Sequence, residues 1–160
     1  MSNTAAPLSI TIRRATRSDL PSIVRMLADD PLGSQREAYR DPLPQSYEDA
    51  FQAIDSDARQ ELIVVEHDGA VIGTLQLTFI PGLSFQGGTR AQIEAVRVDR
   101  EFRSHGVGGR LFEWAIARAR EQGCRLVQLT TNASRADAQR FYERLGFVAS
   151  HVGMKLDLES

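Results

Sequence analysis

The sequence predicts a single α/β domain with a mixed, mostly antiparallel sheet, and three observations lead to this fold class. The chain has 160 residues, which fits one domain of typical size. Strand-like and helix-like periodicities follow one another in the order β-α-α-β-β-β-α-β-α-β-β, which gives about seven strands. Three of these strands are consecutive, and Asp68-Gly69 between the first two is typical of a hairpin turn, so they indicate an antiparallel meander.

Composition excludes several classes of protein. Hydrophobic residues make up 42% of the chain and charged residues 25%, as in ordinary soluble globular proteins. The formal net charge of -2 provides no positive field for nucleic acid or for an anionic membrane, so we expect neither partner. No apolar run is long enough to span a membrane and residues 1–7 lack the pattern of a signal peptide, so a cytoplasmic protein is expected. A single cysteine and three scattered histidines offer little for a metal site, so no metal is expected.

The N-terminal half is expected to contain a tail, a strand and two helices. Residues 1–8 are predicted to be a disordered tail, and residues 9–160 the folded domain. Ser9–Ala15 alternates as a strand does, and a start resembling a capping box at Thr16 then opens an amphipathic helix. The loop over residues 30–44 is rich in proline and long enough to suggest a binding role, and Ser46 opens a second, short helix.

The C-terminal half is expected to contain the meander, two helices and three further strands. Gly123 and Gly146 fit the positions that follow helix ends, where glycine is favoured. The predicted strands are 62–66, 71–80, 90–98, 126–131, 147–152 and 154–158, and the predicted helices cover about 107–122 and a segment that ends at residue 145.

The most informative stretch is Val96–Arg110. An apolar strand ends at Asp99, a polar loop follows, and Arg103–Gly109 opens a long helix. Free N–H groups and the positive end of the macrodipole make a helix start an anion site, and glycines let the backbone approach the anion closely. Four arginines lie in the same stretch, at positions 97, 100, 103 and 110. The predicted ligand is therefore a phosphate or a pyrophosphate.

Two other interpretations of this stretch stay open. A glycine turn between a strand and a helix, with solvated arginines around it, would have the same sequence pattern. A dinucleotide-binding fingerprint is the second, but it needs a third glycine where this sequence has Leu111. The antiparallel strands before the loop also disagree with the βαβ unit that this fingerprint requires.

Two motifs together indicate a family. Arg103-x-x-Gly106-x-Gly108 before a helix, preceded by Val96–Asp99, resembles the acetyl-CoA-binding motif of the GNAT superfamily of N-acetyltransferases. Residues 138–147 read Ala-Gln-Arg-Phe-Tyr-Glu-Arg-Leu-Gly-Phe and are similar to the A-x-x-F-Y-x-x-x-G-F segment of that family. The element order agrees from residue 10 to residue 158. The resemblance implies the three-layer α-β-α GNAT fold, with a sheet that is splayed where acetyl-CoA binds.

The resemblance also implies how acetyl-CoA, as co-substrate, would be held. Its pantetheine arm would form strand-like hydrogen bonds with the backbone of Val96 and Val98, and its pyrophosphate would bind the N–H groups of residues 104–109. Asn132 would bond to the pantetheine arm or cap the next helix. The expected binding residues are Val96, Arg97, Val98, Arg103, Ser104, His105, Gly106, Val107, Gly108, Gly109, Arg110, Asn132, Ala138, Phe141 and Tyr142.

Two residues are candidates for proton transfer in the implied acyl transfer. Tyr142 matches the general acid of the family, which would protonate the leaving thiolate; the alternative is a tyrosine that only packs in its helix. Glu94 is the candidate base, acting through water; a structural glutamate paired with Arg90 is the alternative. Strand alternation places Glu94 with Val96 and Val98 on one face, where a half-buried carboxylate would have a shifted pKa.

The predicted strand 90–98 also supplies the candidate group that polarises the thioester carbonyl. A backbone N–H near Ala95 or Val96 is the candidate to polarise the carbonyl. The same alternation places Ile93, Ala95 and Arg97 together on the second face. A bulge, which the family usually has in this strand, would change both faces.

The function implied is transfer of an acetyl group from acetyl-CoA to a primary amine, by direct attack in a ternary complex. Cys124 is interpreted as a small core residue and not as a nucleophile. A small-molecule amine is favoured over a protein, and the dimers common in the family imply a homodimer. An acidic group in and before the proline-rich loop either attracts a cationic amine or is simply solvated (Asp29, Asp30, Glu37 and Asp41). The rival function is a non-catalytic acyl-CoA-binding regulatory module.

Overall fold

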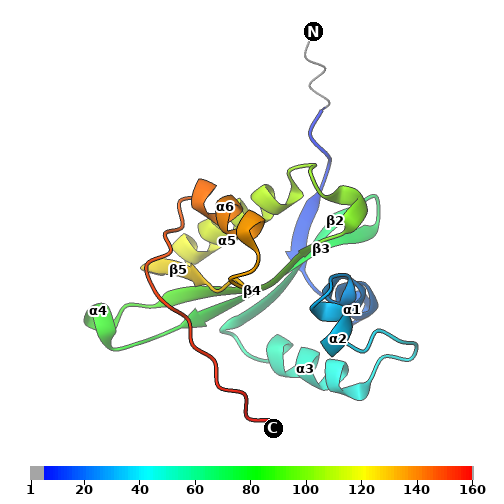
Figure 1. The fold of residues 1–160 in the computed structure, drawn as a ribbon, viewed down its shortest axis with the longest axis horizontal. Coiled ribbons are helices and arrows are strands. Elements are labelled where there is room, and N and C mark those ends of the chain that lie inside the picture. Colours follow the sequence, from blue (N-terminus) through cyan, green and yellow to red (C-terminus); the bar gives the residue numbers. More distant parts are fainter. Residues whose placement is uncertain (1–5, 160) are drawn as a thin grey trace.

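A computed structural model describes residues 6–159, and its framework is one five-stranded sheet in the order β1-β2-β3-β4-β5. Neighbouring strands from β1 to β4 are antiparallel, and β5 runs parallel to β4 (Figure 1). The strands are β1 Thr11–Arg14, β2 Gln60–His67, β3 Ala70–Ile80, β4 Arg90–Val98 and β5 Leu126–Leu129. The α-helices are α1 Leu20–Ala28, α2 Gly33–Arg36, α3 Gln45–Asp55, α4 Ser84–Gly87, α5 Val107–Glu121 and α6 Ala136–Arg144.

Helices cover both faces of the sheet, which confirms the three-layer α/β prediction. On one face α5 and α6 pack over the main core, in which Leu111 and Phe112 of α5 contact residues such as Leu75 and Ile93 of the sheet. On the other face α1 and α3 cover a smaller core that contains Ile23 and Val64 (Figure 1). Because alternate strand residues point to opposite faces, one strand such as β2 contributes to both cores.

Turn and capping residues in the sequence predicted most of these elements correctly. Asp68 and Gly69 both adopt positive φ, as the two central residues of a type I′ hairpin turn require. The N–H of Thr16 donates to Asp19 Oδ2 at 2.7 Å, which is the expected capping interaction before α1. Gly123 follows α5 with φ of +69° and ends that helix as predicted.

The prediction of seven strands was wrong, because the segments 147–152 and 154–158 are not strands in the described structure. Val152, Met154, Leu156 and Leu158 alternate as in a strand but are between 85% and 92% exposed. Alternation marks two faces, whereas a strand also needs a hydrogen-bonding neighbour, and none pairs with this segment within residues 6–159.

The expected tail falls partly on residues 1–5, which lie outside the described residues. Leu8, at its end, packs against the main core, and its carbonyl accepts a hydrogen bond from Arg110. Within residues 6–159 no helix combines the length and the apolar character needed to cross a membrane.

Candidate active site

The sheet opens between β4 and β5. Their parallel pairing begins at Arg90 with Leu126 and ends at Ile93 with Leu129, whereas β4 continues to Val98. Among residues 6–159, the backbone of residues 94–98 therefore has no strand partner on this side. Such an exposed strand edge can form strand-like hydrogen bonds with an extended ligand. The opening lies where the pantetheine arm was expected.

A bulge in β4 marks the start of the opening. Thr74 pairs with Arg97 and Gln76 pairs with Glu94, so Leu75 alone faces the two residues Ala95 and Val96. Ala95 has φ of +52°, in the left-handed region that side chains with a Cβ rarely adopt. The extra residue takes one peptide group out of the regular ladder, which makes its N–H available to a ligand.

The bulge reverses the predicted faces of the strand. Val96 and Val98 pack against the same core as Ile93, although strict alternation placed them opposite it. Arg97 points to the other side, where its Nη2 lies 3.1 Å from Asp30 Oδ2. The expectation of a half-buried Glu94 was also wrong, because its side chain is exposed. The predicted pair with Arg90 does not form among the described residues.

The glycine loop leads directly into the N-terminus of α5. Gly106 is the N-cap residue with φ of +75°, and Ser104 also has positive φ, at +69°. Positive φ values before a helix start are typical of an anion nest, and the first N–H groups of any helix lack partners within it. A Cβ added at Gly108 would lie 3.7 Å from Phe141 Cζ, so the helix start packs closely against α6.

The side chains around this loop form hydrogen bonds with backbone carbonyls of the protein. Arg103 Nε donates to the carbonyl of Val98 at 3.1 Å, and His105 Nδ1 lies 3.0 Å from the carbonyl oxygen of Arg103. Arg110 points away from the loop and donates to Leu8. The loop therefore offers mainly backbone N–H groups to an anion, with the exposed Arg103 beside them.

The acidic group before and within the proline-rich loop mostly neutralises arginines. Asp29 lies 2.6 Å from Arg100 and 3.6 Å from Arg103, and Asp30 pairs with Arg97. Glu37, further along, pairs with Arg36 and accepts a hydrogen bond from Tyr47. Three of the four carboxylates are therefore paired with arginines and are not free to attract a cationic amine, whereas Asp41 is exposed, as in the solvated alternative.

Helix α6 places Phe141 and Tyr142 beside the opening. Both rings pack against Phe112 of α5, with centroid distances of 5.6 and 5.4 Å. Burial raises the pKa of the Tyr142 phenol, while the charges of Arg135 and Arg97 act in the opposite direction. The net upward shift keeps the phenol protonated at neutral pH, as a proton donor must be. Ala138 lies one turn before Tyr142 on the same helix.

Asn132 lies in the segment between β5 and α6. Its Oδ1 accepts hydrogen bonds from the N–H of Ser134 at 3.0 Å and from the hydroxyl of the same residue at 2.7 Å. These bonds fix the turn before α6, but Asn132 does not cap that helix, because its N-cap residue is Arg135.

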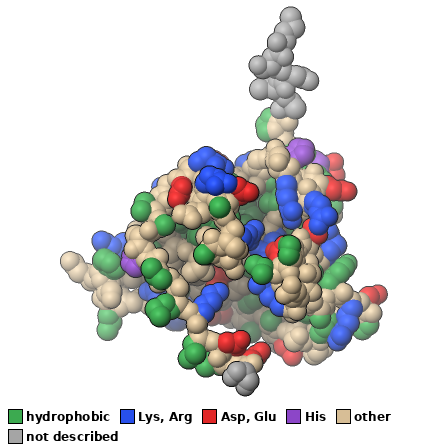
Figure 2. Space-filling view, viewed as in Figure 1, with side chains coloured by type: hydrophobic (Ala, Val, Ile, Leu, Met, Phe, Trp, Pro, Cys, Tyr) green, Lys and Arg blue, Asp and Glu red, His purple; other side chains and the backbone are tan. Residues whose placement is uncertain are grey.

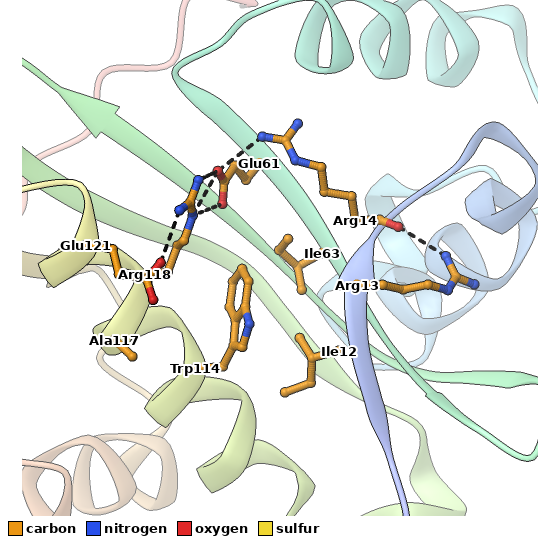
Figure 3. Close-up of a pocket in the computed structure, with 9 residues that line it drawn as sticks. All are labelled: Ile12, Arg13, Arg14, Glu61, Ile63, Trp114, Ala117, Arg118 and Glu121. Carbon is orange, nitrogen blue, oxygen red and sulfur yellow. Dashed lines mark hydrogen bonds and ion pairs between the residues drawn. The ribbon is translucent and has the colours of Figure 1, made fainter.

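A cavity of about 390 Å³ lies elsewhere, between β1, β2 and α5 (Figure 3). Its one buried carboxylate, Glu61, accepts hydrogen bonds from Arg118 at 2.7 to 3.1 Å and from Arg14 at 3.1 Å. Burial raises the pKa of Glu61, but the two arginines outweigh this and lower it. A carboxylate that is fully engaged by arginines holds elements together and is not available to act on a substrate.

Comparisons with known proteins agree with this geometry. The family model described as Acetyltransferase (GNAT) family matches residues 28–147. The chain belongs to the GNAT family. It is therefore an acetyl-CoA-dependent acyltransferase, as the two motifs predicted.

Individual relatives carry different descriptions. An aminoalkylphosphonate N-acetyltransferase of Salmonella typhimurium is 29% identical over 141 residues, which cover 88% of this chain and 86% of that protein. A glucosamine 6-phosphate N-acetyltransferase of Trypanosoma brucei is 33% identical over 90 residues, which cover 56% of this chain and 59% of that protein. A solved structure from Bacillus halodurans, described as a transcriptional regulator, is 52% identical with a TM-score of 0.92, covering 94% of this chain and all of that one.

The structure also brings together residues that the sequence analysis did not connect. Arg97 pairs with Asp30 beside the opening, and the charges of Arg97 and Arg135 both lower the pKa of the Tyr142 phenol. Arg135 precedes α6 and was not singled out. Only its position just before the predicted helix that carries Tyr142 could have indicated that it lies near the site.

Proposed function

We propose that the protein acetylates the primary amine of a small molecule by direct attack of the amine on the thioester of acetyl-CoA. The observation that carries this proposal is the opening between β4 and β5, with its bulge and strand edge, and the raised pKa of Tyr142 on α6 supports a proton donor. The Salmonella typhimurium relative, an aminoalkylphosphonate N-acetyltransferase, supports a small amine as acceptor.

The proposed step forms a C–N bond and breaks a C–S bond. The lone pair of the neutral amine attacks the thioester carbon, and an N–H of the Ala95–Val96 bulge stabilises the oxyanion that develops. As the tetrahedral intermediate collapses, the electron pair of the C–S bond leaves with sulfur, and Tyr142 donates its proton to the thiolate. Solvent then returns a proton to the tyrosinate.

Glu94 is proposed to remove the amine proton through a water molecule. Its side chain is exposed, so solvent water can lie between it and the amine. A water chain to solvent shares the task. Val96, Val98 and the N–H groups of residues 104–109 are proposed to bind the pantetheine and pyrophosphate of the co-substrate.

The experiment that tests this function follows CoA thiol release with a panel of amines. The panel contains small amines of different charge, free lysine and a lysine-containing peptide, and mass spectrometry identifies the acetylated product. Turnover of a small amine at a kcat/KM at least tenfold above that of the peptide is expected. Preferential acetylation of the peptide would contradict the small-molecule acceptor.

A second candidate function is regulation, in which bound acyl-CoA controls a partner protein. It is favoured by the 52% identity to the Bacillus halodurans structure described as a transcriptional regulator. The two functions differ in the role of Tyr142. A regulator should keep its acetyl-CoA affinity and its effect on the partner in Tyr142→Phe, whereas an enzyme should lose rate.

We also propose that the protein acts in the cytoplasm, where acetyl-CoA is available to it, and that it forms a homodimer. The exposed apolar side chains of residues 152–158 support a dimer, because a second copy would remove them from water. Light scattering on the full chain should give twice the chain mass of 17.7 kDa. A molar mass of one chain, the same for the wild type and for Leu156→Ser, would contradict the dimer.

A further inference from the structure

Arg97 is an arginine whose position acetyl transfer itself does not require. Its side chain is only 13% exposed, and it projects from the bulged part of β4 on the side of Asp30. One Nη atom contacts Asp30 and the other donates to the carbonyl of Val96 at 2.8 Å. Its Nε is buried and has no hydrogen-bond partner within residues 6–159. A buried donor without a partner destabilises the protein, so this arrangement is unfavourable for folding alone.

Asp30, which pairs with Arg97 in the described part of the chain, also has a second partner. Asp30 Oδ1 accepts from the N–H of Gly33 at 2.6 Å, which leaves Oδ2 for Arg97. The N–H of Gly33 lowers the pKa of Asp30, and the charges of Arg97 and Arg135 lower it further. Asp30 therefore carries one negative charge between at least two guanidinium groups.

A third arginine, Arg36, acts on Arg97 together with Arg135. Burial lowers the pKa of Arg97 and Asp30 raises it, while the positive charges of Arg135 and Arg36 lower it further. Arg36 has its own partner in Glu37 at 3.0 Å. Arg135 forms no ion pair among the described residues. The group formed by Arg36, Arg97 and Arg135 thus holds more positive charge than its carboxylates neutralise, and we call it the arginine cluster.

The arginine cluster lies next to the reacting end of the site. Arg97 and Arg135 both act on the phenol of Tyr142, which is the proposed proton donor to the thiolate. Because of the bulge, Arg97 points away from the α5 side, where the pyrophosphate loop begins. Lys and Arg side chains also gather in the middle of the face drawn in Figure 2, between the helices α6 and α1 of Figure 1. An acceptor molecule, and not the co-substrate phosphates, is therefore the natural ligand for this excess charge.

We propose that the acceptor amine carries an oxyanionic group, such as a phosphonate, phosphate or carboxylate, which Arg97 and Arg135 bind while the amine faces the thioester. Guanidinium groups match the geometry of such oxyanions and bind them through paired, charge-assisted hydrogen bonds. The bound anion would complete the charge balance of the cluster. This inference rests on the proposed acetyl transfer and adds the substrate class to it.

The first test compares four amines that differ only at the end away from the amino group. They are 2-aminoethylphosphonate, β-alanine, 3-amino-1-propanol and 1,3-diaminopropane. Wild-type kcat/KM should be about 10- to 100-fold higher for an anionic member than for the neutral alcohol, the range expected for charge-assisted hydrogen bonds. The phosphonate and the carboxylate distinguish the two kinds of oxyanion. Equal turnover of the neutral alcohol would overturn the inference.

Arg135→Gln removes one charge from the cluster, and Arg140→Gln is the matched control. Arg140 is exposed on the same helix and pairs with Asp137, away from the cluster. Arg135→Gln should lower kcat/KM for the anionic amines about 10-fold or more and leave 3-amino-1-propanol and the KM for acetyl-CoA nearly unchanged. Arg140→Gln should change none of these. An equal loss for all four amines in Arg135→Gln would contradict a role in binding the anion.

A second measurement separates this inference from the proposed function. Protein saturated with CoA, so that the pyrophosphate loop is filled, is titrated with ethylphosphonate, propionate and 1-propanol in a calorimeter. The anion site is supported if ethylphosphonate or propionate binds and if Arg135→Gln and Arg97→Gln each weaken this binding at least tenfold. This result would support the anion site even if no amine is acetylated and the proposed function fails. Acetylation of neutral amines without binding of either anion at millimolar concentration leaves the proposed function in place and overturns the anion site.

Discussion

Tyr142→Phe separates the chemical role of the phenol from its role in packing. The ring packs against Phe112 at 5.4 Å and against Phe147 at 6.2 Å, and phenylalanine retains these contacts. The hydroxyl has no hydrogen-bond partner among the described residues, so its removal leaves no donor or acceptor of the protein unpaired. The free energy of unfolding should therefore change by no more than about 0.5 kcal/mol.

The rate should change much more than the stability. A positioned general acid contributes about 100- to 10,000-fold to a rate, which corresponds to about 2.7 to 5.4 kcal/mol of transition-state stabilisation. Burial keeps the phenol protonated, so the wild-type enzyme has its acid available throughout the neutral range. The rate of Tyr142→Phe should be at least about 100-fold below that of the wild type, because no other group with a dissociable proton is described at this position.

The assay must isolate the chemical step, because product release limits the turnover of many enzymes. A single-turnover experiment with enzyme in excess over acetyl-CoA measures the rate of product formation directly. Thermal melting and the acetyl-CoA dissociation constant serve as controls and should match those of the wild type. A single-turnover rate within twofold of the wild-type rate would refute the assignment of Tyr142 as the acid.

Three further substitutions test other parts of the account. Glu94→Gln should lower the single-turnover rate about 10- to 100-fold without changing the melting temperature, and an unchanged rate would remove Glu94 from the mechanism. Gly106→Ala should destabilise the protein by about 1 to 2 kcal/mol in denaturant unfolding, because alanine is strained at positive φ; equal stability would show that this conformation can relax. Glu61→Gln should destabilise by about 2 to 3 kcal/mol at neutral pH, because it replaces a charged partner of Arg118. Since the pKa of Glu61 is lowered from 4.5 in the folded state, this difference should be complete above pH 5 and shrink as the pH falls below it, and a difference independent of pH would contradict the role of the ion pairs.

Much of the fold could be predicted because its signals are local. The turn at Asp68-Gly69, the cap at Thr16 and the glycine that follows α5 each depend on a few adjacent residues with restricted backbone conformations. The glycine loop and the segment at residues 138–147 are equally local. They lie at the start of α5 and on α6, with only β5 between them, so the motifs alone predicted where the co-substrate binds.

The features that strand and helix periodicity could not predict depend on partners distant in sequence, and only the resemblance to the family pointed to a bulge in β4. The bulge at Ala95 follows from the pairing of β4 with β3 and from the loss of β5 as a neighbour, and nothing within β4 alone specifies it. Its consequence is large, because one extra residue moves Arg97 from the predicted face to the side of Asp30. The alternation of residues 152–158 likewise resembles a strand but does not specify a partner.

The central claim is that the loop at residues 104–109 binds the pyrophosphate of acetyl-CoA, and calorimetric titration of Gly109→Asp tests it most directly. A Cβ at Gly109 meets no atom within 4 Å, and an acidic residue in the first turn favours the helix, so the fold should be retained. Gly109→Asn is the control of nearly equal size without the charge. The wild type should bind acetyl-CoA more tightly than NAD. The asparagine variant should bind acetyl-CoA with nearly the wild-type affinity. The aspartate variant should bind it about 10- to 100-fold more weakly, because its charge repels the pyrophosphate. Equal affinity for the aspartate and asparagine variants, or a wild-type preference for NAD, would contradict the claim.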